Sequence, residues 1–319
     1  MLVLTCLMHL KNIYLADSKL SFMSNNSKLI SFLFLSYLLV FVSCKKTEDI
    51  VIPDNRVPYY ESVTTLQIQS FVTKAYIDII GSEPSPAERD SKVQQLKNNG
   101  LDSAARAAFI AELQIDSDYR KQFDNIYIAP MFDNIFDSLA NVEAINSLNY
   151  FRSLAVANGD SILSSYWAYE VLKMTLVRDA SNAYHSGTIS INEYKKRMAN
   201  NYYYDQINMG VTNFVIACFE NYLKRLPTDL ELSNSETMSN GQSARVFMRD
   251  GSSKNDFLNI ITTIPGFYEG LVVDCYRHLL NRFPSSVEMN TYTLNLSNGS
   301  KSLKDLQRMI CSSDEYAGF

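Results

Sequence analysis

The stretch Pro84-Ser85-Pro86-Ala87-Glu88 recurs twice in altered form, as PTDLE at residues 227–231 and as PSSVE at residues 284–288. Each copy reads Pro-[Ser/Thr]-x-x-Glu. The hydroxyl residue can accept a hydrogen bond from the glutamate's backbone amide, while the glutamate reaches back to the hydroxyl residue's own amide. This reciprocal capping box starts an α-helix, and the proline before it ends the preceding helix. The predicted structural caps are Ser85, Glu88, Thr228, Glu231, Ser285 and Glu288.

The residues before each proline repeat in the same register. An apolar residue stands thirteen positions before the proline, a small residue nine before, an aromatic eight before, and an apolar pair begins five before. For the first copy these positions are Phe71, Ala75, Tyr76 and Ile79-Ile80. Apolar residues spaced by three and four predict an amphipathic helix. The unit is therefore predicted to be a helical hairpin that occurs three times.

This pattern divides the chain. We expect helical repeats at 66–120, 211–270 and 271–319, with a helical insertion at 121–210 between the first and the second. Helices within the insertion are expected at about 135–157, 161–184 and 191–200, because apolar residues recur there at three and four. The second repeat has a longer loop between residues 231 and 250, which predicts an exposed excursion. The expected fold class is all-α, helical-hairpin repeats with a helical insertion.

The N-terminus has the pattern of an export signal. Lys28 precedes fourteen mostly apolar residues, 29–42, which is the length of a signal-peptide core and short for a membrane-spanning helix. Ser43 places a small residue before Cys44, so we expect a signal peptide at 1–43, a lipidated Cys44 and a tether at 44–65. Translation is predicted to start at Met23, because a signal counted from Met1 exceeds the usual length of about 15–30 residues. An uncleaved signal anchor is the alternative.

The Cys44-Lys45-Lys46 start resembles bacterial lipoproteins, particularly those of the Bacteroidota. Glu48 and Asp49 follow closely, and acidic residues there resemble the signal that directs such lipoproteins to the outer leaflet; a plain linker is the alternative. The resemblance implies an outer-membrane lipoprotein, surface-exposed or periplasm-facing, that contacts the membrane through its N-terminal lipid.

The repeats resemble two further families. The third one resembles a bacterial helical repeat of unknown function from secreted and surface-layer proteins, through Cys275-Tyr276, Leu279-Leu280, Arg282, Pro284, Asn298-Gly299-Ser300 and Ser313-Asp314-Glu315-Tyr316. The first one resembles the helical domain of planctomycete-type surface proteins associated with cytochrome c modules, through Phe71-Val72, Ala75-Tyr76-Ile77-Asp78 and Pro84 to Glu88. The arginine two before the proline is present as Arg225 and Arg282, but Ser82 replaces it in the first repeat. Neither family brings a catalytic site.

Composition argues against several functions. The chain has a formal charge of −5, and removal of 1–43, which carries +2, gives −5 − (+2) = −7, so we expect no nucleic-acid partner. His185 and His278 alone remain after cleavage, too few for the usual zinc sites or a convincing Ser-His-Asp triad. We predict no catalytic residue, no metal, no cofactor and no enzymatic activity. Cys218 and Cys275 occupy the same repeat position and are predicted to be small core residues; a Cys275–Cys311 disulfide stays open.

Aromatic residues supply the candidate ligand site. Trp167 lies in the insertion, and Tyr202-Tyr203-Tyr204 leads into the second repeat. A sugar or a peptide could stack on such rings, whereas the alternative is that they pack against the next helix. The function expected is a cell-envelope lipoprotein that binds or scaffolds envelope proteins or glycans. The alternative is a solute-capturing accessory lipoprotein of glycan uptake, and a hydrolase is the third possibility.

Overall fold

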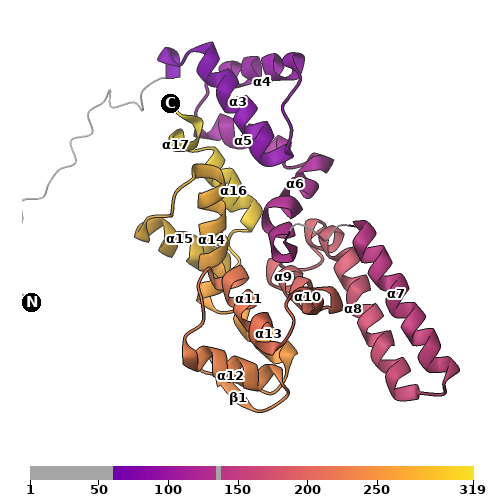
Figure 1. Ribbon diagram of the computed structural model, residues 1–319. Helices are drawn as coiled ribbons and strands as arrows, with labels where there is room; N and C mark the ends of the chain where they lie inside the picture. Colours follow the sequence, from indigo (N-terminus) through magenta and orange to yellow (C-terminus); the bar gives the residue numbers. More distant parts are fainter. Residues whose placement is uncertain (1–59, 134–137) are drawn as a thin grey trace, which may run out of the picture. The chain divides into compact units, whose positions relative to one another are not determined.

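The computed structural model describes residues 60–133 and 138–319 (Figure 1). The chain divides into Met1–Pro58 and one compact unit, Tyr59–Phe319, and every described residue belongs to the second. The predicted signal peptide, the Met23 start, Cys44 and most of the tether lie outside the described residues. The described part contains fifteen α-helices, two short 3-10 helices and one two-stranded sheet, so the fold is all-α, as predicted.

The helices that carry the three motifs have closely similar local geometry. They are α3 (Thr65–Ile80), α4 (Pro86–Asn98) and α5 (Ser103–Leu113); α11 (Val211–Leu223), α12 (Asp229–Ser239) and α13 (Lys254–Ile261); and α14 (Pro265–Leu280), α15 (Ser286–Ser297) and α16 (Leu303–Cys311). In α4, α12 and α15 the hydroxyl residue accepts a hydrogen bond from the glutamate amide at 3.3 Å, and the glutamate carboxylate accepts from the cap amide. The first helix of each set ends at a residue with left-handed backbone: Gly81, Lys224 and Asn281.

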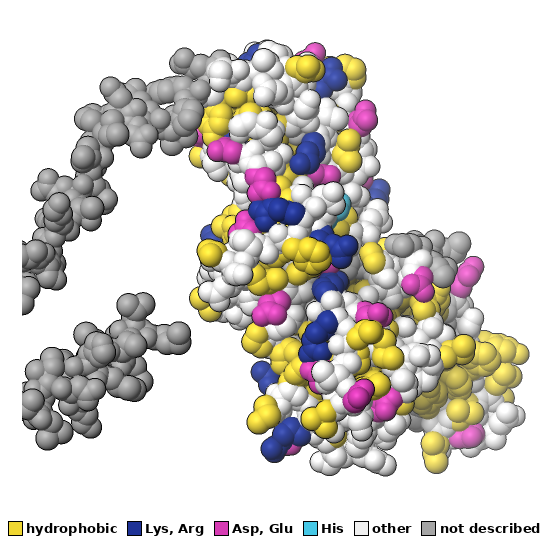
Figure 2. Space-filling view, turned by 60° about the vertical axis from the view of Figure 1, so that its left-hand side comes forward, with side chains coloured by type: hydrophobic (Ala, Val, Ile, Leu, Met, Phe, Trp, Pro, Cys, Tyr) yellow, Lys and Arg dark blue, Asp and Glu magenta, His cyan; other side chains and the backbone are white. Residues whose placement is uncertain are grey.

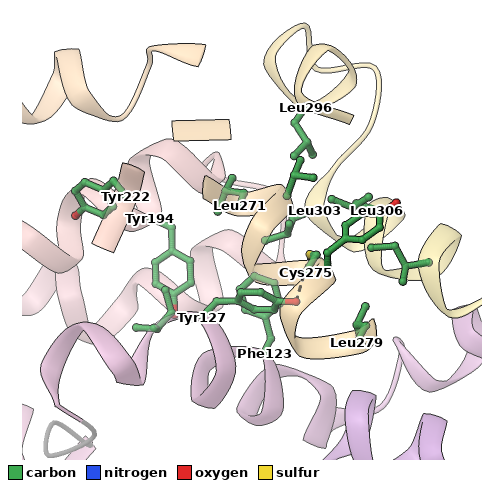
Figure 3. Packing of buried hydrophobic residues seen from close by; sticks show 14 of the residues in the cluster. Phe123, Tyr127, Tyr194, Tyr222, Leu271, Cys275, Leu279, Leu296, Leu303 and Leu306 are labelled. Atoms are coloured by element: carbon green, nitrogen blue, oxygen red, sulfur yellow. Dashed lines mark hydrogen bonds between the residues drawn. The ribbon is translucent and has the colours of Figure 1, made fainter. Parts of the chain in front are cut away.

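The recurring apolar positions point into one core. All are buried: Phe71, Phe214 and Leu271; Ala75, Cys218 and Cys275; Ile79, Tyr222 and Leu279. Cys218 and Cys275 are free thiols in this core, which confirms their prediction as small core residues, and Cys311 is free as well. Figure 3 shows Cys275 beside Tyr127, whose hydroxyl lies 3.4 Å from the sulfur. That the three sets are repeats stays a prediction.

The second motif contains an element that the sequence did not indicate. Its longer loop holds a β-hairpin of β1 (Ala244–Val246) and β2 (Arg249–Gly251), paired antiparallel. The turn residues Phe247 and Met248 have φ of 49° and 64°. Two-residue hairpin turns with positive φ usually contain Asn or Gly, so this turn had no sequence signal.

The first motif packs against the C-terminal end of the chain, where α5 contacts α16 and α3 contacts α17 (Asp314–Ala317) (Figure 1). Tyr316 donates from its hydroxyl to Asp78 at 2.7 Å, and its ring meets Phe71 at 6.1 Å. On the other side α14 contacts α11 of the second motif. Motif three therefore contacts both of the others.

The described part of the segment 121–210 is helical, while its role as an insertion stays a prediction. Helix α6 (Ser117–Tyr127) crosses the start of this segment, and α7 (Ser138–Ala157), α8 (Ser161–His185), α9 (Ile191–Ala199) and α10 (Tyr202–Ile207) follow, with the 3-10 turn Ala129–Phe132 after α6. Helices α7 and α8 pair along their length, and α8 also contacts α6, α9 and α10. Within the described residues, no helix combines the length and the apolar character needed to cross a membrane.

Candidate functional site

Trp167 and Tyr202 come together in an aromatic cluster between the α7–α8 pair and α10. The Trp167 ring lies 6.2 Å from Tyr202, 4.9 Å from Tyr166 and 5.3 Å from Phe151, measured between ring centroids. Tyr166 is half exposed, whereas Trp167 and Tyr202 are partly buried. The sequence did not single out Phe151, because its approach depends on how α7 pairs with α8.

Tyr203 and Tyr204 face other neighbours. The Tyr204 ring is fully buried, 5.8 Å from Phe132, and its hydroxyl accepts a hydrogen bond from Asn221 Nδ2 at 2.9 Å. Tyr203 lies 6.2 Å from Phe132. The structure therefore places Tyr204 in the core, where it offers no surface to a ligand. A ligand site at Trp167 and Tyr202 stays a prediction.

A pocket of about 590 Å³ lies between the end of α8, the start of α9, α6, α14 and the turn from α15 to α16. The residues that form it come from positions 119, 184–192, 268 and 296–304. One wall includes the small side chains of the Ser297-Asn298-Gly299 turn. Ligand pockets typically measure about 300–1,000 Å³, so this volume suits a small molecule.

The apolar walls of the pocket combine aromatic rings with the aliphatic side chains of Ile189, Ile191, Leu296 and Leu303. Tyr119, Tyr184, His185 and Tyr268 all line it. Two of the hydroxyls are held in place: Tyr119 donates to Gln307 Oε1 at 2.7 Å, and Tyr268 accepts from Asn192 Nδ2 at 2.9 Å. Burial raises the pKa of Tyr119 and of Tyr184 well above the usual tyrosine value, so both remain neutral. The rings are therefore fixed, neutral surfaces.

The charged groups of the pocket are positive. Lys301 and Lys304 line it, and none of the described lining residues is an aspartate or a glutamate. The Lys304 ammonium donates to the Gln114 carbonyl at 2.9 Å. Its pKa is lowered mainly by burial and secondly by repulsion from Arg308. Lys301 is exposed. In a chain with net charge −5, this pocket is a local exception.

One helix N-terminus adds to the positive potential. Ser190 caps α9 and lines the pocket, and the first-turn Glu193 pairs with Arg197 at 2.8 Å. Ser302 caps α16 and also lines the pocket, but the Asp305 carboxylate accepts from the Ser302 amide at 2.9 Å and already occupies that N-terminus. Helix N-termini carry partial positive charge from their free N–H groups, which favours an anion nearby.

His185 forms part of the wall but no catalytic triad. Its side chain is 7% exposed, and its Nε2 has no hydrogen-bond partner among the described residues and lies 3.9 Å from Asp124 Oδ1. The Asp124 carboxylate accepts instead from Ser181 at 2.6 Å and Tyr194 at 2.7 Å. In a Ser-His-Asp triad the serine hydroxyl is hydrogen-bonded to the imidazole. Here the Ser181 hydroxyl is hydrogen-bonded to the carboxylate, so these three residues do not form a triad. In the part of the chain that the structure describes, no three His, Cys, Asp or Glu side chains group to hold a metal.

No family model matches the chain, and no curated protein or solved structure is significantly similar to it. The resemblances to lipoproteins and to the two repeat families therefore stay predictions.

Proposed function

We propose that the protein is a cell-envelope binding lipoprotein, anchored by lipid on Cys44, that captures a small anionic solute in the pocket beside the α15–α16 turn. The pocket's composition carries this proposal. Tyrosine rings and aliphatic side chains form its walls, Lys301 and Lys304 supply positive charge, and the described lining contains no carboxylate. Among the functions expected from the sequence, this proposal corresponds to the alternative, a solute-capturing lipoprotein.

The proposed solute has an anionic group and a flat or apolar face. A carboxylate or phosphate is favoured by the two lysines and by the N-terminus of α9. The partly buried rings of Tyr184 and Tyr268 would cover the less polar face. Acidic sugars combine both features, so we take a uronic acid as the first probe.

The same composition favours binding over hydrolysis. A glycosidase needs two carboxyl groups roughly 5–10 Å apart on either side of the bond to be cleaved. The described lining residues offer none. The acidic groups in the first turns of the flanking helices, Glu193 and Asp305, are engaged by Arg197 and Arg308.

Titration calorimetry of the purified chain with D-glucuronate and with D-glucose tests the proposal. We expect heat with glucuronate and much weaker binding of glucose, because only the acid can pair with the lysines. Lys301→Gln should weaken glucuronate binding about tenfold or more, since a hydrogen bond to a charged group contributes about 1.5–3 kcal/mol. The matched control is Lys121→Gln, whose side chain is 79% exposed on α6. Equal binding of both sugars, or no effect of Lys301→Gln, would contradict it.

The location is tested separately. Cys44→Ala should release the protein from the membrane fraction, and protease added to intact cells should cut a C-terminal tag if the chain faces outward. Protection until lysis would place the chain in the periplasm, and membrane retention of Cys44→Ala would contradict the lipid anchor.

A second candidate function is scaffolding of envelope proteins. The α7–α8 pair favours it, because eleven of the twenty-two exposed large hydrophobic side chains in the described residues lie on these two helices.

A further inference from the structure

The outer side of α8 carries an apolar stripe, interrupted by the exposed Ser165. Its residues are Ile162, Tyr166, Tyr169, Leu172 and Leu176, which are 83%, 49%, 55%, 52% and 37% exposed. Their spacing of four, three, three and four keeps them on one side of the helix. Tyr166 also belongs to the aromatic cluster beside α10, and the other sides of α8 contact α7, α6 and α9. Figure 2 shows hydrophobic side chains gathered on the lobe at the lower right, which contains these helices.

The stripe contains no unpaired charge that would oppose burial. Lys173, which falls within it, is only 11% exposed, and its ammonium pairs with Glu170 at 2.7 Å. The α7–α8 pair as a whole, residues 138–185, has four acidic and three basic residues, leaving His185 aside. Helices that lie on membranes have a basic polar face, so this composition does not suit an anionic lipid surface.

The spacing of the stripe is the same read in either direction. Counted from Tyr169, apolar residues lie three and seven positions away on both sides. When two such helices meet antiparallel about a two-fold axis at Tyr169, Ile162 of one copy faces Leu176 of the other. Tyr166 likewise faces Leu172. A surface of this kind is complementary to itself, which is what a two-fold symmetric interface requires.

We infer that the α7–α8 pair is a dimerisation element, in which α8 packs antiparallel on α8 of a second copy and the four helices form a bundle. The available area is enough for a specific interface. A two-fold axis at Tyr169 lets residues 161–177 of the two copies overlap, which is about 25 Å at 1.5 Å per residue. Two helices side by side are about 20 Å wide, so the two copies together bury about 1,000 Å², the lower limit for a specific interface. The interface is separate from the ligand pocket, so either can exist without the other.

A cysteine placed on the two-fold axis tests the dimer in cells that express the full chain. In Tyr169→Cys the introduced thiols of the two copies lie side by side on the axis. Mild oxidation should therefore convert most of the protein into a species of twice the mass on a non-reducing gel. The chain's own Cys218, Cys275 and Cys311 are buried, and the unsubstituted protein controls for the remaining thiols. Tyr150→Cys, on α7 and 61% exposed, is the matched control and should stay largely monomeric.

The register is tested by a second experiment. Ile162→Cys and Leu176→Cys should form a mixed disulfide when co-expressed with different tags, and each alone should form much less. Absence of a dimer with Tyr169→Cys and with the mixed pair would overturn the inference, as would equal crosslinking of Tyr150→Cys. A crosslinked band that contains a different protein would also overturn it and would support scaffolding.

Discussion

Arg282 joins the third capping box to the end of the chain. Its guanidinium donates two hydrogen bonds to Glu288, at 2.8 and 2.9 Å, and two to Glu315, at 2.5 and 2.7 Å. Arg225 makes the same pair of bonds with Glu231 but meets no second carboxylate among the described residues. The arginine that the sequence showed as a repeated position therefore has a structural role, and Ser82 cannot supply it in the first motif.

Arg282→Ala should therefore cost more stability than Arg225→Ala. A bidentate arginine–carboxylate pair stabilises a protein more than an ordinary surface ion pair does. We therefore expect the free energy of unfolding to fall by about 1–2 kcal/mol in Arg282→Ala and by less than about 1 kcal/mol in Arg225→Ala. Urea denaturation at pH 7 measures both.

The arginine hydrogen bonds lower the pKa of Glu288, and lower that of Glu231 to about 2. This stabilisation is present above the unfolded pKa of 4.5 and is lost as the pH falls towards the folded value, so the two variants should converge with wild type in acid. Equal losses at pH 7 would contradict the role of Glu315.

Lys195 is a buried cation without a carboxylate partner among the described residues. It is 2% exposed, and its ammonium donates to the Tyr127 carbonyl and approaches Met131 Sδ at 3.7 Å. Burial, assisted by Lys224, lowers its pKa from 10.5 to about 7. Above pH 7 the unfolded chain therefore binds more protons at this site than the folded chain, so the free energy of unfolding rises with pH by up to about 1.4 kcal/mol per unit.

Lys195→Met should remove this rise between about pH 7 and pH 8.5, the window just above the folded pKa. Above that range the buried thiols act in the opposite sense, because burial raises the pKa of Cys275 to about 12, and an unfolded thiol would lose its proton first. Chemical denaturation at three pH values measures the slope, with Lys121→Met as the exposed control. The same slope in Lys195→Met and wild type would show that Lys195 stays protonated in the folded protein.

Within single helices, local sequence signals predicted most of what is found. The capping box at Ser85 placed the start of α4, and the spacing of apolar residues placed α8 and α9 within one residue at each end. The β1–β2 hairpin was missed, because Phe247 and Met248 adopt positive φ without a glycine or asparagine. Their conformation depends on the surrounding packing, with Phe247 lying 5.8 Å from Phe219.

Tyr276 tests whether the repeated aromatic position is a core position of its helix. It is 3% exposed on α14, and Arg282 lies 4.9 Å from its ring centroid. Tyr276→Ala should lower the free energy of unfolding by about 3–5 kcal/mol, as truncation of buried aromatics does. Tyr150→Ala, at a 61% exposed position, should change it little. Thermal and urea unfolding measure both, and unchanged stability of Tyr276→Ala would contradict the core assignment.

Across the full length of the chain, sequence patterns predicted less. Arg106 is fully buried, which the sequence pattern of its helix did not predict. Its guanidinium donates to the carbonyls of Ser312 at 2.9 Å and Leu101 at 3.0 Å. It also pairs with Asp314 at 2.5 Å. Two of these acceptors lie more than two hundred residues further along the chain, and the third lies in the turn before α5. Only the folded chain brings them together, and the same holds for the pocket, whose walls come from several elements.

Arg106→Met should therefore loosen the contact between the first motif and the C-terminus. Two buried carbonyls would lose their donor, and we expect a loss of about 2–4 kcal/mol. Arg106→Lys should not restore it, because an ammonium cannot reach acceptors in three directions as the planar guanidinium does. Arg120→Met, at an exposed position of α6, is the control. Urea denaturation that gives equal stabilities for Arg106→Met and wild type would contradict the linking role.

Binding of an anionic solute in the pocket beside the α15–α16 turn can be located on the chain by hydrogen exchange with and without glucuronate. We expect slower amide exchange at residues 185–192 and 298–304, which line the pocket, and no change in α7. Slower exchange around Trp167 and Tyr202 instead, or no change anywhere at saturating glucuronate, would contradict the proposed site.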